Sequence, residues 1–185
     1  TWTQVGIAGS GGLIQRDPER PGTIWAKTGY EVTRTDGVYR YSRTIPNFPE
    51  LDTSATSPDG FSGLAPAPGG IAWIGATVHY GVVGNGGALI RLDANNGTYQ
   101  MLRYNQGWPF PGQYVSPLAV TPDGRVWMSY SSEYPSTDAG LCWYDGTNVG
   151  MFPAPPNGEP QWGGLPHAGI KDLEVKVVPD GYELW

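Results

Sequence analysis

The sequence predicts an all-β protein assembled from repeated antiparallel units, and three observations carry this prediction. First, four tryptophans end similar short phrases at spacings of 48, 54 and 58 residues: Trp25, Trp73, Trp127 and Trp185. Second, the 185 residues include 28 Gly and 18 Pro, which are typical of turns, and 12% aromatic residues, which disordered chains lack. Third, no long segment has the apolar periodicity of a helix.

The tryptophan phrases predict the second strand of each unit, which the chain enters from a glycine turn. The phrases are Pro21-Gly-Thr-Ile-Trp25, Gly69-Gly-Ile-Ala-Trp73, Asp123-Gly-Arg-Val-Trp127 and Asp180-Gly-Tyr-Glu-Leu-Trp185. The repeat glycines Gly22, Gly70 and Gly124 each precede their tryptophan by three residues, and the last phrase is one residue longer. A glycine turn that leads into an apolar and aromatic run is typical of a β-hairpin.

Other strand-like runs flank each phrase. A first run precedes the phrase at 12–15, 116–120 and 173–178. A third run follows it at 37–41, 87–92 and 140–144. A fourth run ends the unit at 99–104 and 149–152. Asn96-Gly97 and Asp145-Gly146 separate the third run from the fourth, and such dipeptides favour tight hairpin turns because they tolerate positive φ. The expected unit therefore contains four short antiparallel strands.

The size of this unit predicts a β-propeller, because a blade is a four-stranded antiparallel sheet of roughly 40–50 residues. The expected blades cover 12–52, 64–104, 115–153 and, incompletely, 170–185, with 1–5 as the outer strand of an adjacent blade. A β-sandwich with chance tryptophan spacing is the alternative, and the repetition disfavours it. A propeller needs about 4–8 blades. We therefore expect further chain after Trp185, additional copies, or another subunit to complete the ring.

The third unit carries the most complete phrase, Thr121-Pro-Asp-Gly-Arg-Val-Trp127 followed by Ala139-Gly-Leu-Cys-Trp-Tyr-Asp-Gly146. It resembles the bacterial two-component regulator propeller repeat, in which an Asp-x-Gly-x-Ile/Leu-Trp phrase precedes a Gly-Leu-x-x-Tyr-Asp strand. Trp2-Thr-Gln-Val and Gly164-Leu-Pro166 resemble the family's outermost strand and blade connection. The resemblance implies a propeller that is part of an extracytoplasmic sensor or a secreted module, at an extracellular, periplasmic or cell-surface location. It transfers no catalytic residue.

Composition excludes several partners. The chain has 11 Lys and Arg against 17 Asp and Glu, a net charge of −6, and no basic run, which disfavours nucleic acid. No apolar run approaches the roughly 18–20 residues that membrane insertion requires. Cys142 is the single cysteine, so no internal disulfide can form. No His and carboxylate spacing is typical of a metal site, and no cofactor is expected.

Connection lengths predict where a ligand binds. Alternating strand direction places the short turns on one face, the tight-turn face, and the long connections at 29–36, 47–68, 78–86, 105–115, 131–139 and 153–168 on the other, the long-connection face. The candidate ligand residues on that second face are Tyr30, Glu31, His79, Tyr80, Trp108, Phe110, Glu133, Tyr134, Trp162 and His167. Aromatic rings beside carboxylates suit a glycan or a peptide. The alternative is that these aromatics fill gaps between blades.

These observations predict a non-catalytic binding module whose partner is a protein or a glycan. An enzymatic alternative is a polysaccharide lyase or glycoside hydrolase that uses carboxylates near Glu31 and Glu133 with His79. A third hypothesis is a structural subunit of an extracellular assembly. The loop Asp93-Ala-Asn-Asn-Gly97 has alternating oxygen side chains, as in a calcium loop, but it lacks the later Glu, and a plain turn explains it better.

Overall fold

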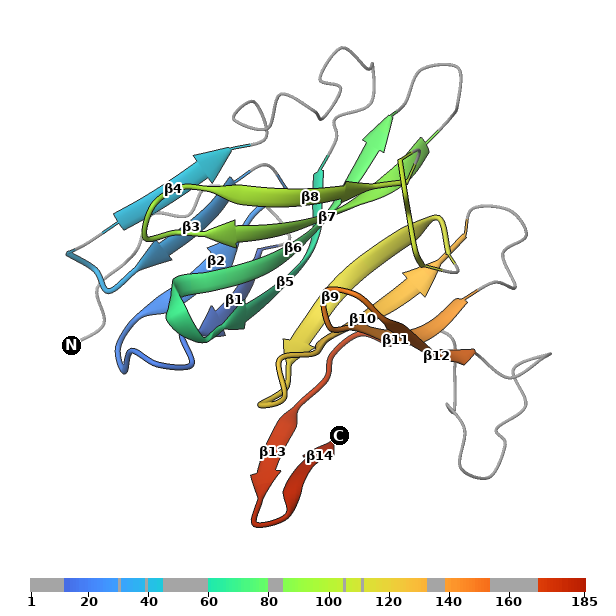
Figure 1. The fold of residues 1–185 in the computed structure, drawn as a ribbon. Helices are drawn as coiled ribbons and strands as arrows, with labels where there is room; N and C mark the ends of the chain where they lie inside the picture. Colours follow the sequence, from blue (N-terminus) through green and yellow to red (C-terminus); the bar gives the residue numbers. More distant parts are fainter. Residues whose placement is uncertain are drawn as a thin grey trace.

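The computed structural model describes residues 12–29, 31–38, 40–44, 60–79, 85–104, 106–110, 112–132, 139–153 and 170–185. Within these ranges every regular element is a β-strand, apart from the short 3₁₀ turn Pro68–Gly70. The strands form three four-stranded antiparallel sheets and one two-stranded hairpin (Figure 1). The predicted all-β class and the four-stranded unit are therefore confirmed.

Each sheet is a meander in which neighbours in sequence are neighbours in space. The first sheet contains β1 (Leu13–Arg16), β2 (Ile24–Lys27), β3 (Glu31–Thr35) and β4 (Arg40–Thr44). The second contains β5 (Gly60–Ala67), β6 (Ile71–His79), β7 (Asn85–Asp93) and β8 (Tyr99–Arg103). The third contains β9 (Tyr114–Val120), β10 (Val126–Ser131), β11 (Ala139–Tyr144) and β12 (Val149–Pro153). The hairpin contains β13 (Val175–Val178) and β14 (Gly181–Leu184).

The first sheet differs from the sequence prediction in its third strand. We expected a loop over 29–36 and a strand over 37–41, whereas β3 occupies most of that loop and residues 40–44 form the fourth strand. The β-branched residues Val32, Thr33 and Thr35 suit the pleated surface and pair with β2. Gly37 has a φ of +95° and belongs to the turn.

The first strand of the second sheet was also missed, because 47–68 was expected to be a connection. Strand β5 contains Gly63 and Pro66, which lower its strand propensity. A Cβ at Gly63 would lie 2.6 Å from Ser116 Oγ and 2.7 Å from the Pro117 nitrogen. Glycine is therefore required there, because β5 approaches β9 too closely for any side chain.

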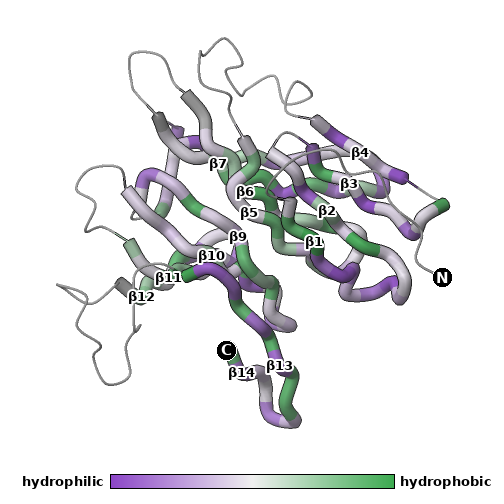
Figure 2. The backbone as a smooth tube through the Cα atoms, turned by 180° about the vertical axis from the view of Figure 1, so that it is seen from behind, coloured by the Kyte–Doolittle hydropathy of each residue, from purple (hydrophilic) through white to green (hydrophobic). Residues whose placement is uncertain are grey.

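The sheets pack face to face through alternate side chains of the second sheet. Ile74 and Ile90 join the core shared with the first sheet, whereas Ala65 and Leu89 join the core shared with the third. We call these two contacts the first seam and the second seam. Figure 2 shows hydrophobic residues along β5 and β6, between the outer two sheets. Both faces of the second sheet are therefore covered, and in β5 every residue from Gly63 to Ala67 is buried.

The repeat tryptophans lie on equivalent faces of successive units. Trp25 is fully buried in the first seam, Trp73 packs in the second seam, and Trp127 joins a third cluster with Leu184 of the hairpin. An aromatic side chain can bury about 150–250 Å² in this way. Trp185, which follows β14, is 71% exposed. The repeat glycines occupy the preceding turns with φ of +86°, +73° and +85° at Gly22, Gly70 and Gly124.

Candidate functional site

Glu31, a predicted ligand residue, lies in β3 and is occupied by its own sheet. Its Oε1 accepts hydrogen bonds from Thr33 Oγ1 (3.2 Å), Arg40 Nη2 (2.7 Å) and Ser42 Oγ. The hydrogen bond from Ser42, assisted by that from Arg40, lowers the pKa of Glu31 although partial burial opposes this. A general acid of a glycosidase needs a raised pKa, so these contacts do not favour that role.

The aromatic residues Trp108 and Phe110 fill the second seam beside the long connections. The indole Nε1 of Trp108 donates to the Gly112 carbonyl at 2.7 Å, and its ring meets Phe110 edge to face at a centroid distance of 4.8 Å. Phe110 is 6% exposed and contacts Tyr144 at 5.5 Å between ring centroids. These contacts agree with the alternative that the two aromatics close a gap between sheets.

The other predicted ligand residues are not brought into one site by the described structure. His79 is the last residue of β6 and pairs with Asn85. Six further candidates lie outside the described residues: Tyr30, Tyr80, Glu133, Tyr134, Trp162 and His167. Glu31 belongs to the first sheet and Trp108 packs against the core of the second seam. The long-connection site therefore stays a prediction.

A cavity of about 700 Å³ lies instead in the second seam, at the tight-turn face. The β5–β6, β9–β10 and β11–β12 turns reach its edge, and strands β6, β7 and β8 supply one wall. The lining includes Ala67, Pro68, Ile71, Trp73, Leu89, Arg91, Gln100, Leu102, Val120, Thr121, Tyr144 and Asp145. Sequence reasoning missed this site because it treated the short turns only as connections.

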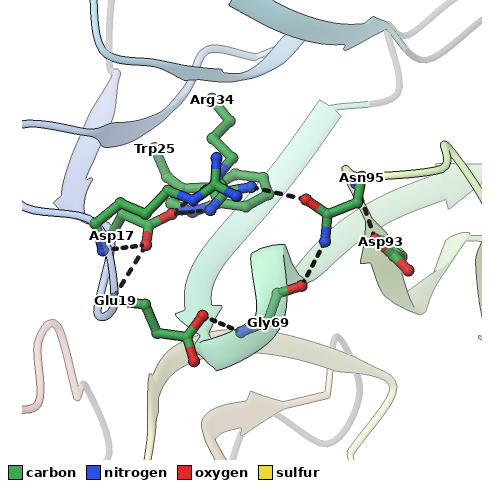
Figure 3. A network of polar contacts seen from close by, with 8 residues as sticks. Asp17, Glu19, Trp25, Arg34, Gly69, Asp93 and Asn95 are labelled. Carbon is green, nitrogen blue, oxygen red and sulfur yellow. Dashed lines mark hydrogen bonds and ion pairs between the residues drawn. The ribbon is translucent and has the colours of Figure 1, made fainter.

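The same place in the first seam holds a buried ion pair (Figure 3). Asp17 Oδ2 accepts hydrogen bonds from Trp25 Nε1 (3.0 Å) and Arg34 Nε (2.8 Å), and Arg34 Nη2 lies 2.7 Å from the same oxygen. Both side chains of the ion pair are 1% exposed. Burial raises the pKa of Asp17, but the backbone hydrogen bond from Glu19 and the contacts with Arg34 outweigh it, so the net pKa is lowered.

This ion pair connects the first sheet to the second. Arg34 Nη1 donates to Asn95 Oδ1 at 3.3 Å, and Asn95 Nδ2 donates to the Gly69 carbonyl at 2.7 Å (Figure 3). The Gly69 N–H donates back to Glu19 Oε2 at 2.6 Å. A Cβ at Gly70 would lie 2.7 Å from Arg34 Nη1, so the first seam is filled up to the turn backbone.

Strand register identifies the equivalent residues of the second seam. Trp25 is paired with Gln15 and Arg34, and Trp73 is paired with Ala65 and Arg91. Asp17 comes two residues after Gln15, and Ala67 comes two residues after Ala65. Each is followed by a proline. Alternate residues of a strand share a face, so Ala67 occupies the position of Asp17.

The third unit supports this equivalence. Two residues beyond Ala119, the partner of Trp127, stands Thr121, which is again followed by a proline. Its Oγ1 accepts a hydrogen bond from Trp127 Nε1 at 3.3 Å. The first and third units thus supply an oxygen to the repeat tryptophan from the same turn position, and Ala67 of the second unit has none to supply.

Two polar side chains line this cavity, those of Arg91 and Trp73. Among the described residues, the half-buried Arg91 guanidinium has no ion pair and Trp73 Nε1 has no hydrogen bond, although the Trp73 ring meets Tyr144 edge to face at 6.0 Å. A Cβ at Gly124, the counterpart of Gly70, would have no atom within 4 Å. The second seam is therefore open where the first is filled.

Other chemistry-bearing residues have structural roles. Cys142 is completely buried, and burial raises its pKa to about 12, so the thiol is protonated near neutral pH. Asp93 closes its own turn by accepting from the Asn95 N–H (2.8 Å) and Asn96 Nδ2 (2.9 Å). Over the ranges given above, no group of His, Cys, Asp and Glu could hold a metal ion. No helix of those ranges is long and apolar enough to cross a membrane.

No protein-family model, curated protein or solved structure matches this chain.

Proposed function

We propose that the chain is a non-catalytic binding module of the β-propeller type, and that its ligand occupies the cavity of the second seam. The observation that carries this proposal is the cavity itself, with its volume of about 700 Å³. Small-molecule sites usually have roughly 300–1,000 Å³, apolar walls and a few polar groups that fix orientation. Here Trp73, Leu89, Leu102 and Val120 form walls, and Arg91 supplies a charge.

The propeller part of the proposal rests on the arrangement of the sheets. Three four-stranded meanders stack face to face, and β5, the first strand of its sheet, lies against the first strands β1 and β9 of its neighbours. First strands gathered in this way are expected around the axis of a propeller. Ring closure by further chain or subunits, membership of the two-component regulator propeller family and an extracytoplasmic location belong to the same proposal.

A binding role is favoured over catalysis because two residues with catalytic chemistry, Cys142 and Glu31, are held in structural roles. Cys142 is buried and protonated, and Glu31 is held by three donors of its own sheet. A lyase or hydrolase would depend on Glu133 and His79, whose side chains lie outside the description. A protein or glycan partner on the long-connection face stays compatible with this proposal as a second surface.

A ligand screen on the whole chain tests the proposed site. We would record ligand-observed NMR spectra with a library of small acids, amides, sugars and peptides, then repeat them with Ala67→Leu, which places a larger side chain in the cavity. The control Thr77→Leu introduces the same leucine at an exposed position of β6, away from the tight turns. We expect binders that Ala67→Leu displaces and Thr77→Leu does not. If Ala67→Leu leaves every binder unaffected, the cavity is not the ligand site.

A further inference from the structure

The second seam has the donors of a carboxylate site but not the carboxylate. In the first seam one oxygen of Asp17 receives a tryptophan N–H and an arginine guanidinium. The second seam repeats the tryptophan and the arginine at the same register, as Trp73 and Arg91, and has Ala67 where the carboxylate would stand. This inference rests on the proposed function, since it concerns the ligand of the same cavity.

We propose that this cavity binds a small carboxylic acid with an apolar body, and that the ligand carboxylate takes the place that the Asp17 side chain has in the first seam. Its oxygens accept hydrogen bonds from Trp73 Nε1 and the Arg91 guanidinium. A planar guanidinium matches a carboxylate with two parallel donors, and hydrogen bonds between ionised groups are the strong ones. In the first seam, Arg34 Nε, Arg34 Nη2 and Trp25 Nε1 all approach one carboxylate oxygen, Asp17 Oδ2, at distances of 2.7–3.0 Å.

The remaining lining specifies the body of the ligand. Besides Gln100, Thr121 and Asp145, the apolar lining consists mainly of Ile71, Leu89, Leu102, Val120 and Tyr144. These side chains offer few partners to a hydroxyl-rich sugar, whereas they suit an alkyl or phenyl group. At the rim, the exposed Asp145 is a fixed negative charge whose Oδ1 already accepts from Thr147 and Asn148. A second anionic group on the ligand would be repelled there, which favours a monocarboxylate.

Calorimetric titration of the whole chain with 4-phenylbutyrate and with its neutral amide, 4-phenylbutyramide, tests the carboxylate. The two probes have the same body and differ in charge. We expect the acid to bind at least about tenfold more tightly, a difference of about 1.4 kcal/mol. Arg91→Gln should remove this preference, and Trp73→Phe, which keeps a ring but loses the N–H, should weaken binding of the acid. Arg16→Gln removes the same charge from an exposed position of β1 and should change nothing.

A second variant supplies the missing group from the protein. Ala67→Asp should place a carboxylate beside Arg91 and Trp73, raise the melting temperature and abolish binding of 4-phenylbutyrate. The nearly isosteric Ala67→Asn lacks the charge and should raise the melting temperature less. Adding Arg91→Gln to Ala67→Asp should cancel the increase in melting temperature. If Ala67→Asp acted only on the turn, Arg91→Gln would not cancel that increase.

The outcomes separate the ligand chemistry from the site. Equal affinities for acid and amide, or an Arg91→Gln variant that behaves like Arg16→Gln, would overturn the carboxylate inference. If neutral compounds still bind and Ala67→Leu displaces them, the proposed site survives without its carboxylate. If Ala67→Leu displaces nothing, both the site and the inference are wrong.

Discussion

The two seams of this protein share a tryptophan and an arginine at the same register and differ at the position beside them, which is Asp17 in the first seam and Ala67 in the second. Both pair a tryptophan of the second strand with an arginine of the third. In the first seam Asp17 binds both side chains, and the side chains of the Asp17–Arg34 ion pair are each 1% exposed. In the second seam Ala67 leaves the donors facing a cavity of about 700 Å³. The comparison teaches that a repeat interface can hold either an internal ion pair or an open site without a change of backbone register.

The comparison also separates what packing does from what the ion pair does. The second seam is held together by Leu89, Met128 and other apolar residues, although it lacks a buried ion pair in the described structure. The ion pair of the first seam is therefore not a general requirement of stacking. Once its partners are buried, however, each becomes indispensable to the other, because an unpaired buried charge is costly.

The largest expected effect comes from converting the first seam into the second. Asp17→Ala leaves the Arg34 charge buried without its carboxylate and should reduce the free energy of unfolding by about 3–5 kcal/mol. Urea unfolding of the whole chain measures this loss. The control Asp180→Ala, at an exposed turn of the hairpin, should cost less than about 0.5 kcal/mol. A loss below about 1 kcal/mol for Asp17→Ala would mean that the first seam does not depend on the pair.

The next effect concerns the close contact between β5 and β9 in the second seam. Gly63→Ala would place a Cβ 2.6 Å from Ser116 Oγ and 2.7 Å from two backbone atoms of Pro117. Forcing β5 from β9 should cost about 1–3 kcal/mol, as overpacking does. Gly29→Ala, where a Cβ meets no atom within 4 Å, is the control in thermal unfolding. Equal stability of the two variants would contradict the close approach.

Acid should weaken the first seam through protonation of Asp17, a carboxylate whose position is taken by Ala67 in the second seam. The pKa of Asp17 is lowered from 3.8 in the folded state, so its contribution is complete above the unfolded pKa and is lost as the pH falls through the folded one. We expect stability to fall below about pH 4 and to fall less steeply in Asp17→Ala. The lowered pKa of Glu31 also contributes, so Glu31→Gln is the parallel variant. Identical acid profiles for wild type and Asp17→Ala would contradict the pair.

The smallest expected effect is that of Arg91→Gln without ligand. Because Arg91 is half-buried and has no ion pair among the described residues, its loss should change the free energy of unfolding by less than about 0.5 kcal/mol. Arg34→Gln, at the equivalent position, should cost several times more. Chemical denaturation of the two variants side by side measures the contrast. Similar losses would mean that Arg91 has a structural role comparable to that of Arg34.

Much of the fold was predictable because the tryptophan phrases locate the second strand of every sheet. Strand β5 was missed because Gly63 and Pro66 resemble a loop, and the reason for the glycine is contact with β9, which local sequence does not reveal. Likewise, the sequence predicts a connection where β3 lies, although the β-branched residues of β3 favour a strand. Tertiary pairing decided both cases.

The cavity was less predictable than the fold. Its signal in the sequence is the residue before the turn proline of each unit. This residue is Asp17 in the first unit and Thr121 in the third, whereas the second unit has Ala67. That signal becomes meaningful only with the pairing that places Arg91 beside Trp73. The predicted site residues lie in or beside long connections, where aromatic residues are numerous, whereas Trp108 packs against the core of the second seam.

Alternation along β7 insulates the two interfaces from each other. Ile90 points into the first seam and its neighbour Leu89 into the second, so adjacent residues serve different interfaces. A substitution on one face therefore leaves the other core with its original side chains. In evolutionary terms, each boundary between repeats can gain or lose a cavity independently, while the strand that separates them keeps its register.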